Sequence, residues 1–232
     1  MAPFFNALLF GIYPYIALAV LALGSVIRYD REPYTWRSGS SQLLRRKQLV
    51  WGSVLFHLGV LAIFGGHLVG LLTPLWVWNT LGVTHTEKQL TAIILGGAAG
   101  ASGIVGASLL IHRRFFDARV RAASSFADNA IILILWVQLA LGLTTISVSL
   151  QHLDGEEMVK FMNWAQGIFT FNPAAAGYIA DASPIFKMHI TLGLTIFVLF
   201  PFTRLVHMLS VPVRYIWRPG YQVVRSKCRP AE

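Results

Sequence analysis

The sequence predicts an all-α integral membrane protein in which five helices cross the bilayer. Of its 232 residues, 55% are hydrophobic and only 12% are charged, and the mean hydropathy is +0.60. A soluble domain carries about twice that charged fraction. The apolar residues also gather in long runs without Asp, Glu, Lys or Arg, and a spanning helix needs about 20 such residues. A multi-pass membrane protein is therefore expected.

Five charge-free runs define the predicted spans, and we treat residues 1–232 as one domain because no internal repeat is visible. The spans are 4–27, 49–72, 88–112, 129–149 and 184–209, followed by a basic tail, 210–232. The second span ends before an interfacial aromatic belt of Pro74, Trp76 and Trp78. The fifth span rests on the charge-free run 188–203 and its weakly charged flanks.

The third span carries small residues at four-residue spacing, Gly96 with Gly100 and Ala99 with Gly103. This pattern favours close helix packing, with room for a flat macrocycle as the alternative. The stretch 161–180 is also charge-free, but Asn163, Gln166, Asn172 and Pro173 make it too polar and broken for lipid. We therefore expect an interfacial helix and loop there, rather than a sixth span.

The positive charge is distributed unevenly along the chain. Sixteen of the nineteen Lys and Arg residues fall in 28–47, 113–121 and 204–229, which five spans place on one side of the membrane. The other three, Lys88, Lys160 and Lys187, fall on the opposite side. The positive-inside rule then predicts an outside N-terminus and a cytoplasmic C-terminus. This distribution argues against a nucleic-acid partner and for membrane lipid.

Four histidines lie in the apolar segments, His57 and His67 in the second span and His189 and His207 in the fifth. An ionisable residue inside a membrane is a functional candidate by default. The second span runs outward and the fifth inward, so depth pairs His57 with His207 near the cytoplasm and His67 with His189 near the outer face. Two such pairs supply axial ligands for two haems b, which points to transmembrane electron transfer.

The spacing of the two histidines on the second span does not match the spacing of the two on the fifth. His189 and His207 are eighteen residues apart, so on one continuous helix they share a face and lie about 27 Å apart. His57 and His67 lie only about 15 Å apart and differ by roughly 80° around their helix. The helices must cross or tilt, or His207 must reach inward from a helix end. Glycines 59, 65, 66 and 70 beside the second-span pair would let a ring approach the backbone.

Other roles for the histidines are weaker. A single membrane histidine is often a helix–helix hydrogen-bond partner, and zinc or copper transport sites usually add carboxylates or thiols, which these spans lack. His85, His112 and His152 fall at span ends or in loops, where solvated histidines are ordinary. The one cysteine, Cys228, excludes an iron–sulfur cluster ligated by this chain's cysteines and a CxxCH haem attachment.

Several segments resemble the gamma subunits of respiratory nitrate reductases. The resemblance rests on IYPYIALAV, RYD, YTWRSGSSQLLRRK, FHLGVLAIFGGHLVGLLTP and FVLFPFTRLVHMLSVPV, and it covers nearly the whole chain. His57, His67, His189 and His207 fall at the four haem-ligand positions of that family. The family is a cytochrome b that anchors its enzyme, so the resemblance implies a part in anaerobic nitrate respiration and a location in a bacterial or archaeal cytoplasmic membrane.

The resemblance implies a quinol dehydrogenase subunit with two haems b. It would take electrons from quinol at the outer face, release protons there, and pass the electrons to a cytoplasmic iron–sulfur subunit. The nitrate-reducing site would lie on a molybdenum-containing partner subunit. Lys88 matches a lysine that the family uses near the bound quinone, whereas the residues alone favour an interfacial lysine that snorkels to solvent.

Some alternatives stay open at this stage. The chain could be a related two-haem cytochrome of a sulfur-metabolism or heterodisulfide-reductase-type complex, which its soluble partner would reveal. It could also be a haemless, histidine-bearing transporter or anchor. Arg113, Arg114 and Arg204 lie at inner span ends. They are interpreted as positive-inside anchors, with pairing to propionates of the inner haem as the alternative.

Overall fold

The computed structural model describes residues 2–36 and 44–210. Most of the basic tail, with Cys228, and residues 37–43 lie outside this part of the chain. Five of the described helices are long and apolar enough to cross a membrane, which confirms the expected number of spans. They are Pro3–Arg31, Arg46–Leu72, His85–Phe116, Phe126–Ser149 and Pro184–Phe202.

The first span is built from α1 (Ala2–Ala7), a π-helical turn η1 (Leu8–Ile12) and α2 (Tyr13–Arg31). Pro14 has no N–H to donate to the carbonyl of Phe10, four residues earlier. The indole Nε1 of Trp164 donates to that carbonyl instead, at 2.9 Å. After α2 the chain turns through the short 3₁₀ helix η2 (Pro33–Thr35).

The second and third spans, α3 (Arg46–Leu72) and α5 (His85–Phe116), pack closely, with the short α4 (Leu75–Thr80) between them in the chain. A Cβ placed on Gly59 of α3 would lie 2.5 Å from the carbonyl oxygen of Ala99. A Cβ on Gly103 would contact Leu139, and one on Gly100 would meet Leu143 at 2.7 Å. Ala99, Gly100 and Gly103 therefore serve helix packing, as the sequence favoured, whereas a Cβ on Gly96 would meet nothing within 4 Å.

After α5, capping residues stand at the start of each of the next two helices. Asp117 accepts hydrogen bonds from the first turn of α6 (Ala118–Ala122). Ser125 and Asp128 form a reciprocal capping box at the start of α7 (Phe126–Ser149), which satisfies two backbone N–H groups.

The stretch after the fourth span forms α8 (Glu156–Phe169) and the 3₁₀ turn η3 (Ala175–Ile179). With 14 residues α8 is about 21 Å long, shorter than the hydrocarbon core of about 30 Å. Its apolar face, with Trp164 and Ile168, packs against Phe10 of the first span and Ile179 of η3. The expected helix and loop are thus present, and this stretch is not among the five candidate spans.

The last span differs from the expectation. The helix α9 (Pro184–Leu199) gives way to the 3₁₀ turns η4 (Phe200–Phe202) and η5 (Arg204–Leu209). Pro201 cannot donate to the carbonyl of Phe197, and Thr203 is extended at φ −121° and ψ −179°. The prediction of one continuous helix over 184–209 was therefore wrong, and His189 and His207 lie on different elements.

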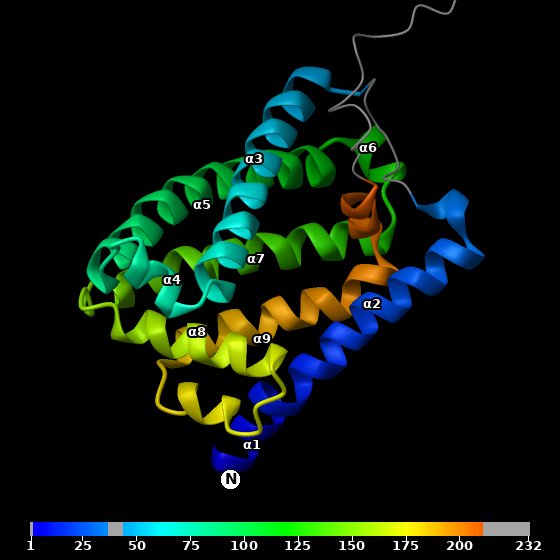
Figure 1. The fold of residues 1–232 in the computed structure, drawn as a ribbon. Coiled ribbons are helices and arrows are strands. Elements are labelled where there is room, and N and C mark those ends of the chain that lie inside the picture. Colours follow the sequence, from blue (N-terminus) through cyan, green and yellow to red (C-terminus); the bar gives the residue numbers. More distant parts are fainter. Residues whose placement is uncertain (1, 37–43, 211–232) are drawn as a thin grey trace, which may run out of the picture.

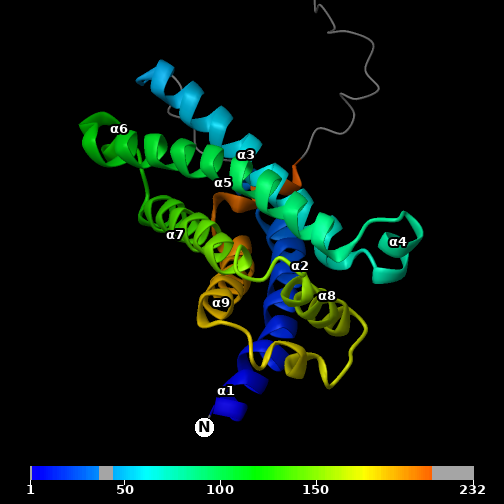
Figure 2. The ribbon, with the colours of Figure 1, turned by 90° about the vertical axis from the view of Figure 1, so that its left-hand side faces the viewer.

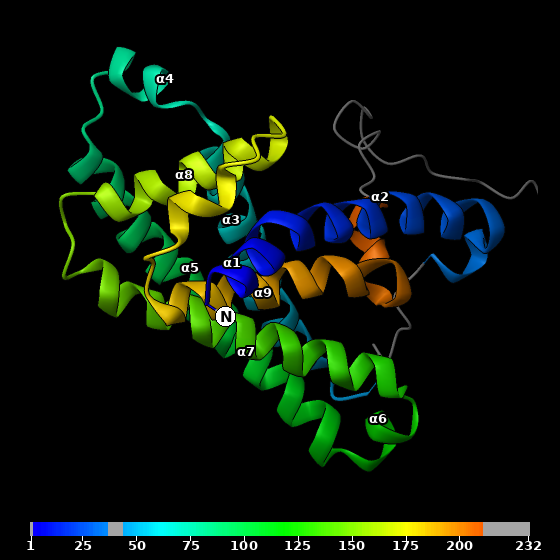
Figure 3. The same cartoon turned by 90° about the horizontal axis from the view of Figure 1, so that it is seen from below.

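Along the order α3, α5, α7, α9, α2 each helix packs against the next, so the spans form an arc (Figures 1 and 2). The elements α1, α4 and α8 gather at one end, which we call the α8 end (Figure 3). The charged α6 and the C-terminal part of α2 lie at the other, which we call the basic end (Figures 1 and 3). The two ends differ in charge as the sequence indicated.

Candidate functional site

The structure brings the four membrane histidines together in two pairs. The rings of His67 on α3 and His189 on α9 have centroids 6.2 Å apart, with 38° between their planes. The rings of His57 on α3 and His207 on η5 are also 6.2 Å apart, with 72° between their planes. The residues that share a predicted depth are thus neighbours in space, although His207 reaches its partner from a turn.

Three of the four imidazoles are oriented by backbone carbonyls. The Nδ1 of His57 donates to Ser53 O at 2.7 Å, and that of His67 donates to Ile63 O at 2.8 Å. The Nδ1 of His207 donates to Arg204 O at 2.5 Å. A metal-ligating histidine usually makes this kind of bond, because it fixes the tautomer that leaves the Nε2 lone pair for the metal.

His189 has a different environment. Its Nδ1 is buried without a hydrogen-bond partner, and its Nε2 lies 3.4 Å from the amide nitrogen of Gln138 on α7. The same amide donates to the backbone carbonyl of His189 at 3.1 Å. A Cβ on Gly142 would lie 3.0 Å from Cε1 of this ring, so the glycine lets the ring pack closely against α7. Gln138 was missed by sequence reasoning, although an amide in the middle of an apolar span is itself a signal.

The spacing within both pairs fits two imidazoles on opposite faces of one iron. A first-row metal binds imidazole nitrogen at about 2 Å, and the ring centre lies about 1.1 Å further on. Two imidazoles that bound one iron from opposite sides would therefore have centroids about 6.2 Å apart, which matches the 6.2 Å of each pair. Across residues 2–36 and 44–210, no three His, Cys, Asp or Glu side chains gather into a metal site. Two nitrogens per site suit an iron whose other four ligands come from a porphyrin.

The glycines of α3 divide into two kinds. A Cβ on Gly65, Gly66 or Gly70 would meet nothing within 4 Å, so the backbone beside His67 is open to a flat group. Gly59 instead packs against the backbone of α5, so the expectation that it also admits a ring was wrong. His57 and His67 are themselves exposed on this helix. An uncovered imidazole in hydrocarbon is unfavourable, which fits a site that an apolar ligand covers.

Lys88 lies at the α8 end, in the first turn of α5, and only 8% of its surface is exposed. Its Nζ donates to Gly70 O at 3.0 Å, contacts Met162 Sδ at 2.6 Å, and lies 4.8 Å from the centre of the Trp78 ring. The ammonium therefore points into the protein between α3, α4 and α8, and the snorkelling interpretation was wrong. Gly70 follows His67 by one helical turn, which places Lys88 near the His67–His189 pair.

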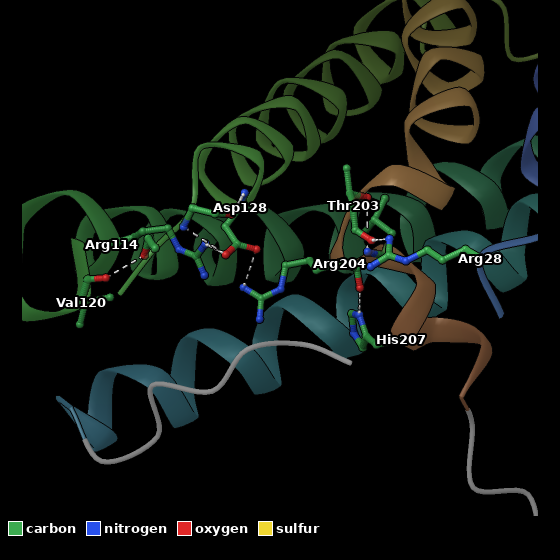
Figure 4. Close-up of polar contacts among 10 residues, drawn as sticks. Arg28, Arg114, Val120, Asp128, Thr203, Arg204 and His207 are labelled. Carbon is green, nitrogen blue, oxygen red and sulfur yellow. Dashed lines mark hydrogen bonds and ion pairs between the residues drawn. The ribbon is translucent and has the colours of Figure 1, made fainter. Parts of the chain in front are cut away.

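The three arginines singled out in the sequence have protein partners at the basic end. Arg113 is buried and donates to Leu44 O at 2.7 Å, which ties the entry of α3 to α5. Arg114 and Arg204 flank Asp128, with closest N···O distances of 4.0 Å and 3.5 Å (Figure 4). Asp128 directly precedes the predicted fourth span, 129–149.

The chain is similar to known proteins over nearly its whole length. The family model described as nitrate reductase gamma subunit matches residues 6–227. The chain is 48% identical to respiratory nitrate reductase 1 gamma chain of Escherichia coli K12, over 97% of this chain and 99% of that protein. It is 46% identical to the respiratory nitrate reductase 2 gamma chain of that strain, over 98% and 100%. It is 36% identical to the nitrate reductase gamma chain of Bacillus subtilis 168, over 95% and 98%.

Matches of this identity and coverage, together with five apolar helices, settle the family and the membrane location. The chain is a multi-pass membrane protein of the nitrate reductase gamma subunit family.

Proposed function

We propose that this chain is the quinol-oxidising, di-haem b membrane subunit of a respiratory nitrate reductase. The observation that carries the proposal is that α3 and the α9–η5 segment form two pairs of imidazoles, each with ring centroids 6.2 Å apart. Family membership supports it, because relatives that align over nearly their whole length are named as gamma chains of that enzyme.

The positive-inside rule orients the chain in this proposal. The basic end, with Arg28, Arg114 and Arg204, faces the cytoplasm, and the α8 end, with Lys88 and Lys160, faces outside. The N-terminus is then outside and the C-terminus inside. The cytoplasmic face is where an iron–sulfur subunit docks, and a molybdenum-containing catalytic subunit completes the complex.

His67 and His189 are the proposed ligands of an outer haem, and His57 and His207 those of an inner haem. When bound, the two haems supply one-electron carriers at two depths of a hydrocarbon core about 30 Å thick. The protein's own contribution is to hold each imidazole in place. Backbone carbonyls orient His57, His67 and His207, and Gln138 holds the backbone of His189.

Lys88 is the proposed quinol contact. Its ammonium donates to the carbonyl of Gly70, which lies about one turn of α3 after His67. Met162 and Trp78 enclose the ammonium. A charged donor there stabilises negative charge that develops on a quinol oxygen as its proton leaves. The released protons go to the outside, because this end of the bundle faces outside in the proposed orientation.

A reduced-minus-oxidised spectrum of the solubilised protein, with haem quantified per chain, tests the haem proposal. We expect close to two low-spin b haems, falling to about one in His67→Ala and in His207→Ala. His112→Ala is the matched control, since His112 contacts Gln48 and Phe116 and belongs to neither pair. A folded protein without a Soret band would refute the proposal.

The quinol site needs a separate test. Lys88→Ala should keep both haems while quinol-driven haem reduction slows by about 10- to 150-fold, because a hydrogen bond from a charged group contributes about 1.5–3 kcal/mol. Lys160→Ala is the control on the same side, since its ammonium pairs with Glu157 and Asp181 at the surface. Equal rates in both variants would remove Lys88 from the site.

The soluble subunits that copurify distinguish a nitrate reductase from a sulfur-metabolism or heterodisulfide-reductase-type complex.

A further inference from the structure

His207 is the one paired histidine that no membrane-spanning helix carries. It belongs to η5, a 3₁₀ segment of 6 residues. A segment this short has little stability of its own, so neighbouring elements must fix its position. Leu205 and Val206 supply an apolar anchor, because they are buried in a cluster with Ile131 of α7 and Phe200.

Two charged side chains from other helices fix the polar side of the segment. Arg28 on α2 donates through Nη1 to Pro201 O at 2.6 Å and to Thr203 O at 2.8 Å, which holds the backbone where α9 breaks. Asp128 on α7 lies with Oδ1 3.5 Å from Nη1 of Arg204. Figure 4 shows Asp128 between Arg114 and Arg204, with His207 beyond Arg204.

The contact at Arg204 is coupled to the histidine through the backbone. The carbonyl oxygen of Arg204 accepts the hydrogen bond from His207 Nδ1 at 2.5 Å. Holding the side chain of Arg204 therefore restrains the residue whose carbonyl sets the plane of the imidazole. The side chains of Asp128 and Arg204 are 25% and 23% exposed, so water screens this ion pair only in part.

We propose that Asp128 is a positioning residue for the inner haem ligand His207, acting through Arg204. The inference rests on the proposed function, because it presumes that His207 ligates a haem. Outer-shell partners of a metal ligand typically change metal affinity by about 10- to 100-fold when they are removed. Asp128 and His207 lie on elements that are distant in the chain, and one ion pair and one hydrogen bond, both through Arg204, link them.

Asp128 also caps α7, and the variants must separate that role from positioning. Its Oδ2 accepts from Ser125 N, and its own N–H donates to Ser125 Oγ. Asp128→Asn retains an oxygen acceptor for the cap and removes the carboxylate charge. Ser125→Ala removes the hydroxyl from the cap and leaves the carboxylate in place. Asp128→Glu retains the charge and tests for rescue.

The measurement uses the full chain with its partner subunits in native membranes. Each haem is followed by its low-spin EPR signal, its midpoint potential and its rate of transfer to excess apomyoglobin. His207→Ala and His67→Ala assign the inner and outer signals. In Asp128→Asn we expect an altered inner signal and potential, with inner-haem transfer about 10-fold faster. The outer haem should stay unchanged, Ser125→Ala should match the wild type, and Asp128→Glu should recover most of the inner signal.

Three results would overturn the inference. An inner haem that is unchanged in Asp128→Asn would mean that Arg204 is held by something else, such as a haem propionate. Equal disturbance of both haems, or an equal effect of Ser125→Ala, would assign Asp128 a purely structural role. A wild-type protein without low-spin haem would instead overturn the proposed function, and this inference with it.

Discussion

The close crossing of α3 and α5 predicts that Gly59→Ala disturbs both histidine pairs at once. A Cβ at this position would lie 2.5 Å from Ala99 O and 2.5 Å from Gly103 N. Ordinary contacts of a Cβ begin at 3.4 Å, so the two helices must separate by about 1 Å at this point. The atoms in the way belong to the backbone of α5 and cannot yield by rotation of a side chain.

The cost of this separation is set by packing. Forcing an extra methyl group into a closely packed interface typically destabilises a protein by about 1–3 kcal/mol. Because α3 carries both His57 and His67, its displacement also moves one histidine of each pair relative to its partner. We therefore expect weaker binding of both haems, in contrast to the one-haem effect of single histidine variants.

Gly96→Ala supplies the matched control, since a Cβ on Gly96 meets nothing within 4 Å. Alanine favours a helix over glycine by about 1 kcal/mol, so this variant should be at least as stable as the wild type. Haem per chain and the thermal midpoint of the Soret band, measured in one detergent, give the comparison. Identical values for Gly59→Ala and Gly96→Ala would refute the argument from helix packing.

Three further predictions concern the ends of the bundle. Trp164→Phe keeps the buried ring but removes the donor to Phe10 O, so the denaturation midpoint should fall by an amount equivalent to about 1–3 kcal/mol. The hydrogen bond from Lys160 lowers the pKa of the Asp181 carboxyl below its ordinary 3.8. The stabilisation from this contact is therefore complete above pH 3.8 and is lost as pH falls through the lower pKa of the folded state. Proteolysis of the α8 region should increase in acid in the wild type and stay independent of pH in Asp181→Asn. Pro201→Ala lets α9 continue, and we expect selective loss of the inner-haem signal; loss of the outer one instead would contradict this.

The spans were predictable because lipid imposes a local requirement on each segment. Backbone groups must bond within the helix and side chains must be apolar, whatever the neighbouring helices are. The charge-free runs therefore mark all five helices, and the amides around Asn163 and Gln166 mark α8 as interfacial. The pairing of His67 with His189 also needed only chain direction and depth, both of which follow from counting spans.

Tertiary contacts decide the features that the sequence left open or assigned wrongly. Gly59 and Gly65 look alike in the chain, yet one packs on α5 and the other faces open space. Lys88 lies at a span end, where a lysine usually reaches water, but α4 and α8 fold over it. The sequence context of Asp128 indicates only a helix cap with Ser125, and its relation to His207 appears only when α7 and η5 come together.

The break after Leu199 resolves the mismatch in histidine spacing. On α3 the two histidines are separated by ten residues, about 15 Å, whereas an unbroken α9 would carry His207 about 27 Å from His189. Two straight helices would have to absorb this difference of about 12 Å by crossing or tilting. Ending the helix at Pro201 turns the chain, and the η5 segment places His207 opposite His57. The position of this ligand is then a property of tertiary contacts, which is why charged residues from α2 and α7 surround the turn.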